Sequence, residues 1–174
     1  MHRLNVHDYP QLITSARTCR RITAAGARVI TTILPSGRVL DFGGGRWSDA
    51  QEFLLAAGIH CNVYDPYNRS QAENKVALWA RYDAMMCCNV LNVLTDDVLP
   101  RAIEDMATIC EHSKIGVVVV TVYERNKTGR GEMSGIDEYQ RNERLKDYAP
   151  RLGLYFRNIR KVGKALVMNP KGSP

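Results

Sequence analysis

The chain lacks the long apolar segments that mark membrane-bound and secreted proteins. No apolar run approaches the roughly 18 to 20 residues of a membrane-spanning helix, and the longest, Ile115 to Val122, is interrupted by Thr121. The N-terminus carries His2 and Arg3 but no apolar core of the signal-peptide type. We therefore expect a cytoplasmic protein that does not enter a membrane.

The cysteines and histidines do not show the spacing of metal ligands. The five cysteines and four histidines form no CxxC and no Cys/His pattern of the zinc-binding kind. The cysteines lie inside apolar patterns, as is typical of buried free thiols in a reducing compartment. The sequence therefore predicts no metal site.

The remaining composition is that of an ordinary folded domain. Of 174 residues, 45% are hydrophobic and 24% are charged, which suits one domain with its own core. The net charge of +6 and the pI near 9.2 make nucleic acid a candidate partner. An ordinary solvated surface explains such a charge about equally well.

Helical and strand patterns alternate over most of the chain. Apolar residues at three- and four-residue steps predict helices, and short apolar runs predict buried strands. In helix 48–57 the spacing turns Phe53 inward together with Leu54, and helix 71–80 has an apolar side with Val76 and Trp79. The predicted order is helix 10–34, strand 38–42, helix 48–57, strand 59–64, helix 71–80, strand 82–88, a helix that begins near Thr95, and strand 115–122.

The last third of the chain departs from this alternation. Residues 124–135 are polar and contain glycines, which indicates a loop, and residues 136–148 have a helical pattern. Two further strands, 154–160 and 164–168, are so close in sequence that they can form only an antiparallel hairpin. The predicted fold class is α/β, with a mostly parallel sheet and a C-terminal antiparallel hairpin at one edge.

Three consecutive glycines, Gly43, Gly44 and Gly45, follow the first predicted strand and precede a helix. In a parallel α/β sheet, ligands bind at the carboxyl ends of the strands. Glycines there permit positive φ angles and carry no Cβ atom that would keep a ligand from the backbone. The turn therefore predicts a ligand that lies against backbone amides.

Two aspartates indicate which ligand this is. Asp65 ends the second predicted strand, where a carboxylate can accept hydrogen bonds from both hydroxyls of a ribose. Asp41 would repel a pyrophosphate but attract an ammonium group, and Ser48 replaces the last glycine of the dinucleotide pattern GxGxxG. S-adenosylmethionine therefore fits better than NAD, and a nucleotide-dependent oxidoreductase is the weaker alternative.

The segments VLDFGGG, VYDPYN and YDAMMCCNVLNVL, within Arg38 to about Val122, resemble the class I S-adenosylmethionine-dependent methyltransferases, especially small stand-alone bacterial and bacteriophage members. The resemblance implies a Rossmann-like methyltransferase fold with S-adenosylmethionine as cofactor. It assigns Asp41 and the glycines to the methionine end, Asp65 to the ribose, and Pro66 and Tyr67 to the surroundings of the adenine. It places Asn89 where cofactor and acceptor meet.

The chain also departs from that family. Trp47 stands where the family's third glycine is usual, so it either caps the cofactor or fills part of the site. The interval from Asp65 to Asp83 leaves room for one helix but hardly for the usual extra strand and its acidic residue that contacts adenine. We therefore expect a trimmed sheet.

The acceptor side is less well defined by sequence. The segment Asn89 to Asn92 lacks the proline–aromatic half of the motif with which related enzymes methylate exocyclic amines of DNA bases, so that activity is not supported. Asn89 is either an acceptor-orienting group or a turn residue. Tyr139 and Gln140 are further candidates for acceptor contacts, with ordinary packing as the alternative for Tyr139.

These patterns together predict a single methyltransferase-like domain. Its acceptor is not identified and can be a nucleic acid, a nucleotide or a small molecule. The alternative is a catalytically inactive relative that binds nucleic acid or a protein partner. Four parts are expected: an N-terminal helical segment (1–36), a cofactor-binding core (37–123), an acceptor-side loop and helix (124–150) and a terminal hairpin (151–170).

Overall fold

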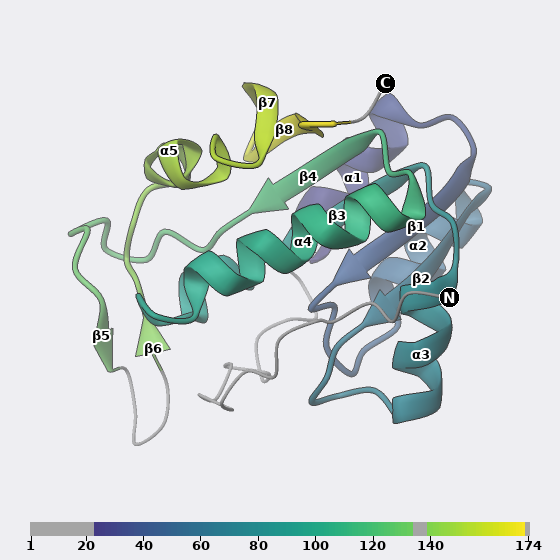
Figure 1. The fold of residues 1–174 in the computed structure, drawn as a ribbon, viewed down its shortest axis with the longest axis horizontal. Coiled ribbons are helices and arrows are strands. Elements are labelled where there is room, and N and C mark those ends of the chain that lie inside the picture. Colours follow the sequence, from purple (N-terminus) through teal and green to yellow (C-terminus); the bar gives the residue numbers. More distant parts are fainter. Residues whose placement is uncertain (1–22, 134–138, 173–174) are drawn as a thin grey trace.

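A computed structural model describes residues 23–133 and 139–172 of the chain (Figure 1). The centre is a six-stranded sheet in the order β2-β1-β3-β4-β8-β7, in which β1 to β4 are parallel and the C-terminal pair is antiparallel. This arrangement confirms the predicted fold class. The strands are β1 (Gly37–Phe42), β2 (Ile59–Tyr64), β3 (Ala84–Cys88), β4 (Val117–Thr121), β7 (Phe156–Val162) and β8 (Ala165–Pro170).

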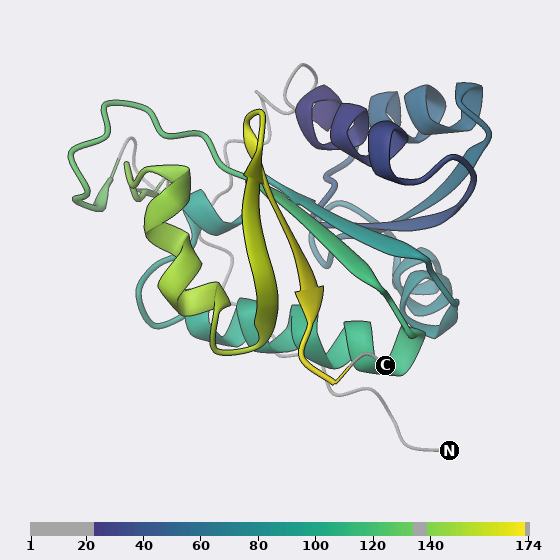
Figure 2. The same ribbon diagram turned by 90° about the horizontal axis from the view of Figure 1, so that it is seen from above.

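Helices cover both faces of the sheet, as Figure 2 shows from above. Residues of α1 (Thr23–Ile33) and α2 (Asp49–Ala56) join one apolar cluster, and residues of α3 (Gln71–Trp79) and α4 (Leu99–Ser113) join the other. Successive strand residues point to opposite faces, so Val39 packs with the first cluster and Leu40 with the second. The strands between the helices are therefore covered on both sides, as their continuous apolar runs predict.

The sheet is trimmed, as expected. Only α3 connects β2 to β3, so β2 is an edge strand. The side chain of Gln51 donates a hydrogen bond of 2.9 Å from Nε2 to the carbonyl oxygen of Cys61 in this strand. Such a contact satisfies a backbone group that a neighbouring strand would otherwise bind.

The helices match the predictions in position better than in orientation. Both α2 and α3 form, but Phe53 is 39% exposed and Val76 is 63% exposed. In α3 the buried residue is Ala77. Spacing identifies the apolar side of a helix, whereas the sheet beneath decides how much of that side is covered. The first predicted helix is described only from Thr23 onward, and its part before that residue lies outside the described residues.

The predicted helix 136–148 is wrong over its described part. Tyr139–Gln140 forms the short strand β6, which pairs with β5 (Glu132–Met133) inside the predicted loop. A 3₁₀ turn, Leu145–Tyr148, and the short helix α5 (Ala149–Leu152) follow only later. Between them lies a polar stretch that is buried, and Asn142 has a left-handed φ of 57°. Tertiary polar contacts hold this stretch, and apolar periodicity does not detect them.

Candidate functional site

The parallel strands have their carboxyl ends at the same edge of the sheet, and this brings the predicted site residues together there. Phe42 is in register with Tyr64, and Cys88 with Thr121. The turn of glycines continues the β1–β2 pairing by one step, because the amide of Gly43 donates to the carbonyl oxygen of Tyr64 at 2.7 Å. This hydrogen bond fixes the start of the turn relative to the end of β2.

Different structural constraints favour glycine at the three positions of the turn. Gly43 and Gly45 have φ angles of 74° and 71°, in the left-handed region that glycine adopts without strain. A Cβ on Gly43 would clash with Val90, and one on Gly44 would clash with the carboxylate of Asp41. A Cβ on Gly45 would meet nothing within 4 Å. Gly45 therefore borders open space.

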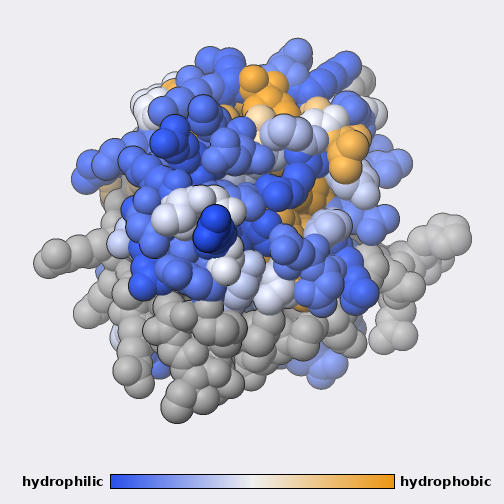
Figure 3. Space-filling view, turned by 90° about the vertical axis from the view of Figure 1, so that its left-hand side faces the viewer, coloured by the Kyte–Doolittle hydropathy of each residue, from blue (hydrophilic) through white to orange (hydrophobic). Residues whose placement is uncertain are grey.

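That space belongs to a pocket of about 720 Å³, counting the part open to solvent. Figure 3 views the face onto which the strands' carboxyl ends open, where hydrophobic residues are visible among hydrophilic ones. Seven of the predicted residues line the pocket: Gly43, Gly45, Trp47, Asp65, Pro66, Tyr67 and Asn89. Its other lining residues are Phe42, Arg46, Tyr64, Asn68, Cys88, Val90, Leu94 and Ala102.

Neither Asp41 nor Gly44 lines this pocket. The carboxylate of Asp41 lies against Gly44. Asp41 is only 1% exposed, and no group among the described residues donates a hydrogen bond to either of its carboxylate oxygens. Burial, and then the charge of Asp65, raise the pKa of Asp41 to about 7, while Arg69 acts in the opposite direction. Asp41 is thus a buried carboxylate directly beneath the glycine turn.

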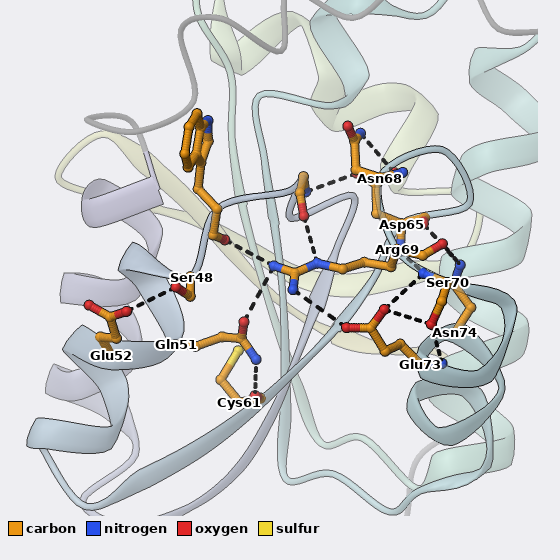
Figure 4. Close-up of polar contacts among 12 residues, drawn as sticks. Ser48, Gln51, Glu52, Cys61, Asp65, Asn68, Arg69, Ser70, Glu73 and Asn74 are labelled. Atoms are coloured by element: carbon orange, nitrogen blue, oxygen red, sulfur yellow. Dashed lines mark hydrogen bonds and ion pairs between the residues drawn. The ribbon is translucent and has the colours of Figure 1, made fainter.

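Asp65 connects the turn to the segment after β2 (Figure 4). Its Oδ2 accepts a hydrogen bond of 2.8 Å from the amide of Gly45. Its Oδ1 accepts three, from the amides of Tyr67 and Asn68 and from Nδ2 of Asn68, at 2.9 to 3.0 Å. A carboxylate offers about four acceptor positions, so Oδ2 is the oxygen with room for a further donor from the pocket.

Arg69 is a site residue that no motif predicts. Its Nε donates to the carbonyl oxygen of Gly45 at 2.8 Å, and its Nη2 donates to that of Trp47 at 3.0 Å. In sequence Arg69 is one of 24 basic residues. The only signal for it is its position in the turn between Asp65 and a helix start. That helix start has the capping-box pattern, with Ser70 as N-cap and Glu73 three residues later.

Asn89 lies at the pocket wall in a strained turn. It follows β3, has a φ of 59°, and its amide donates to the carbonyl oxygen of Thr121 at 2.9 Å. The preceding Cys88 also borders the pocket, but its sulfur packs against α1 where a Cβ on Gly26 would lie. The structure therefore places the side chain of Cys88 as a packing group, in agreement with its apolar sequence context.

Tyr139 and Gln140 do not line the pocket. Gln140 donates from Nε2 to the carbonyl oxygen of Tyr123 at 2.9 Å and accepts at Oε1 from Nδ2 of Asn92 at 3.1 Å. Both ends of its amide thus bind protein groups. Tyr139 packs against Gly131. Gln140 connects the segment after β4 to the segment after β3. Any contact of either residue with an acceptor stays a prediction.

An ionic cluster lies next to this connection, with Arg141 and Glu143 largely buried and Asp96 exposed. Nη2 of Arg141 is 2.7 Å from Oδ1 of Asp96 and 2.8 Å from Oε1 of Glu143, whose Oε2 is 2.7 Å from Nη1 of Arg151. Burial disfavours the charged form of Glu143, but the hydrogen bonds from the two arginines outweigh it and lower the pKa of Glu143. The cluster anchors residues 141–143 to the loop that precedes α4.

The described residues contain neither a group of metal-ligating side chains nor a helix that could span a membrane. Within 23–133 and 139–172, no three histidine, cysteine or acidic side chains group as metal ligands would. Over the same ranges, no helix has the length and apolar character needed to cross a bilayer.

Comparison with known proteins identifies the fold. No protein-family model and no curated protein matches the sequence. Solved structures do match, and many of them are S-adenosylmethionine-dependent methyltransferases. The identities of 16 to 18% establish the fold alone. The chain therefore has the class I methyltransferase fold, as its motifs suggested.

Three of these structures illustrate the similarity. The 1,6-didemethyltoxoflavin-N1-methyltransferase of Burkholderia thailandensis has a TM-score of 0.62 and 18% identity over 88% of this chain and 79% of its own. Magnesium protoporphyrin IX methyltransferase of Synechocystis has a TM-score of 0.59 and 16% identity over 95% and 90%. A TehB-like methyltransferase of Corynebacterium glutamicum has a TM-score of 0.54 and 18% identity over 90% and 96%. The first two contain bound S-adenosylhomocysteine.

Proposed function

We propose that the chain is a methyltransferase that binds S-adenosylmethionine in the pocket beside the glycine turn. One observation carries the proposal. Gly45 opens onto a pocket at the carboxyl edge of the sheet, with Asp41 beneath the turn and Asp65 at the end of the neighbouring strand. In an open α/β sheet this edge is where nucleotide-containing ligands bind.

The residues present fit this cofactor. The bare Gly45 supplies backbone without a side chain, and Oδ2 of Asp65 has room to accept one hydroxyl of a ribose. The wall formed by Tyr64, Val90 and Leu94 is apolar and suits the faces of an adenine ring. The negative charge of Asp41, when ionised, favours the ammonium group of the methionine moiety.

Methyl transfer depends more on how the cofactor and the acceptor are placed than on reactive side chains. The bound cofactor would supply a methyl group on a positively charged sulfur, which a nucleophilic atom displaces in line. The protein contributes by fixing the cofactor against the sheet edge and by holding the acceptor at the correct angle. The apolar wall excludes water, and Asn89 is the side chain that we assign to the boundary between the two ligands.

The acceptor is proposed at the level of class only. The similar structures include enzymes named for a didemethyltoxoflavin and for magnesium protoporphyrin IX, which favours a small molecule over nucleic acid. The basic charge of +6 keeps nucleic acid as the second candidate. We propose the cytoplasm as the compartment, since no disulfide joins the cysteines in the described part of the chain.

Calorimetric titration with S-adenosylhomocysteine tests the proposal. The wild-type protein is expected to bind with a dissociation constant on the order of micromolar. Asp65→Asn keeps the size of the side chain but places an amide where a carboxylate accepts, so affinity falls at least about tenfold. Glu104→Gln, on the exposed side of α4, is the matched control and binds normally.

Absence of binding by the folded wild type would contradict the proposal. The inactive methyltransferase-like module would then be the better account. With binding established, transfer of a labelled methyl group to pooled small molecules, RNA and DNA identifies the acceptor class.

A further inference from the structure

Gly45 is the only member of the glycine turn for which the described hydrogen bonds tie both backbone groups to the segment after β2. Its amide donates to Oδ2 of Asp65, and its carbonyl oxygen accepts from Nε of Arg69. Both side chains come from one short stretch of chain (Figure 4). Because the two bonds act on successive peptide groups, they fix the orientation of the backbone on either side of the residue that borders the pocket.

Arg69 also reaches beyond Gly45. Its Nη2 donates to the carbonyl oxygen of Trp47 at 3.0 Å and to Oε1 of Gln51 at 3.4 Å, and Nη1 lies 3.8 Å from Oε1 of Glu73. The guanidinium therefore spans the turn and the start of α2, and its side chain is 14% exposed. An arginine suits this task, since its planar fork donates in several fixed directions at once.

The segment that carries Arg69 is itself rigidly held. Oδ1 of Asn74 accepts from the amide of Asp65 at 2.8 Å, and Nδ2 of Asn74 donates to the carbonyl oxygens of Asp65 and Arg69 at 2.9 and 3.2 Å. The capping box between Ser70 and Glu73 fixes the start of α3 immediately after Arg69. The side chain of Arg69 thus links the start of α3 to the glycine turn.

Trp47 is the pocket residue most affected by this arrangement. It lines the pocket, its carbonyl oxygen is bound to Arg69, and its ring lies 4.7 Å from the guanidinium carbon of Arg46. Since Trp47 occupies the place where the family usually has a glycine, its indole decides whether the pocket is open or partly filled. The contact at its carbonyl restrains the backbone from which the indole projects.

We propose that Arg69 is the positioning residue that holds the glycine turn and Trp47 in the shape that admits the cofactor. This inference rests on the proposed function, because the cofactor is the ligand for which the shape is required. It adds a determinant that the glycine and aspartate motif lacks: a cation after the second strand that binds the carbonyl oxygens of Gly45 and Trp47.

The test separates the shape of the turn from binding. The chain has two tryptophans, so in a Trp79→Phe background Trp47 is the only one. Acrylamide quenching of its fluorescence reports how accessible the indole is, whether or not a ligand binds. The variants are Arg69→Gln, Arg69→Lys, and the control Arg28→Gln on the exposed side of α1.

In Arg69→Gln the quenching constant is expected to rise about twofold and the dissociation constant for S-adenosylhomocysteine about tenfold, or about 1.4 kcal/mol. Arg69→Lys, which keeps the charge but not the fork, gives intermediate values. Arg28→Gln leaves both quantities at the wild-type level. Thermal unfolding confirms that each variant is folded, and Arg69→Lys decides the matter if the glutamine variant does not fold.

Unchanged quenching and unchanged affinity in folded Arg69 variants would overturn the inference. The same holds for weaker binding without any change in the accessibility of Trp47, which would assign Arg69 a purely electrostatic role. If the wild type binds no S-adenosylhomocysteine, the proposed function fails, whereas the quenching comparison still decides whether Arg69 restrains the turn.

Discussion

The region of the glycine turn and the segment between β4 and β7 both depend on buried polar contacts, but with opposite results. Around the turn, Asp65 and Arg69 bind backbone groups and leave open space beside Gly45. In the second segment, Arg141 and Glu143 bind other charged side chains and fill the interior. The contacts of the first region border a pocket, whereas those of the second lie in a filled part of the interior.

The comparison also separates what holds each region in place. The turn is held by residues that follow β2 directly, 20 and 24 residues after Gly45. The second segment depends on pairs such as Arg141 and Asp96, which are 45 residues apart. Disturbing the second region is therefore expected to lower the stability of the fold, and disturbing the first mainly to lower ligand affinity.

The largest expected effect is at Arg141. Arg141→Met removes one member of the ionic cluster and leaves Glu143 with Arg151 alone. Breaking such a cluster costs about 3 to 5 kcal/mol of unfolding free energy, measured by urea denaturation. Lys146→Met, at an exposed position nearby, should change stability by less than about 0.5 kcal/mol. An equally small loss in Arg141→Met would show that the cluster does not support the segment.

The next effect concerns pH and the carboxylate beneath the turn. The pKa of Asp41 is raised from 3.8 to about 7, so the folded state binds a proton more tightly than the unfolded state. The stability that comes from this proton is complete below about pH 4 and is lost as pH rises toward about 7. Relative to Asp41→Asn, the wild type should lose roughly 2 to 4 kcal/mol of unfolding free energy between pH 4 and pH 8.

Urea denaturation of both proteins across this pH range measures the difference. Glu104→Gln serves as control and should follow the wild type. Parallel curves for wild type and Asp41→Asn would mean that the pKa of Asp41 is the same in the folded and unfolded states, which would contradict the prediction.

A smaller effect on stability is expected at two glycines, of which only one should also affect ligand binding. Gly45 and Gly58 have φ angles of 71° and 76°, and a Cβ on either meets nothing within 4 Å. Alanine at either position should therefore cost about 1 kcal/mol of stability from backbone strain. Only Gly45→Ala should also abolish calorimetric binding of S-adenosylhomocysteine, since only Gly45 lines the pocket. Equal binding by the two variants would place the cofactor elsewhere.

The smallest effect is expected at Tyr139. Tyr139→Phe removes a hydroxyl outside the pocket, so the affinity for S-adenosylhomocysteine should stay at the wild-type value and stability should change by less than about 0.5 kcal/mol. Calorimetry and thermal unfolding check both. A clear loss of cofactor affinity would mean that the second segment reaches the pocket.

The contrast between the regions explains how much the sequence could predict. The turn was predictable because glycine is required where φ is positive and no Cβ fits, and because strand ends place Gly45 and Asp65 together. The helix predicted over 136–148 was wrong because its residues also have contacts that no local pattern shows. Arg141, Asn142 and Glu143 are buried polar residues. Arg141 binds Asp96, 45 residues away, and Asn142 binds residues 129, 130 and 132.

The sequence by itself determined the alternation of strands and helices, the hairpin at the sheet edge and the position of the glycine turn, because these depend on periodicity and on local backbone freedom. Only the tertiary structure decided that Arg69 binds the turn, that Asp41 lies beneath it without a donor among the described residues, and that Gln140 binds the protein at both ends of its amide. The physical reason is that the partners of a polar side chain depend on which distant segments the fold brings within hydrogen-bond distance.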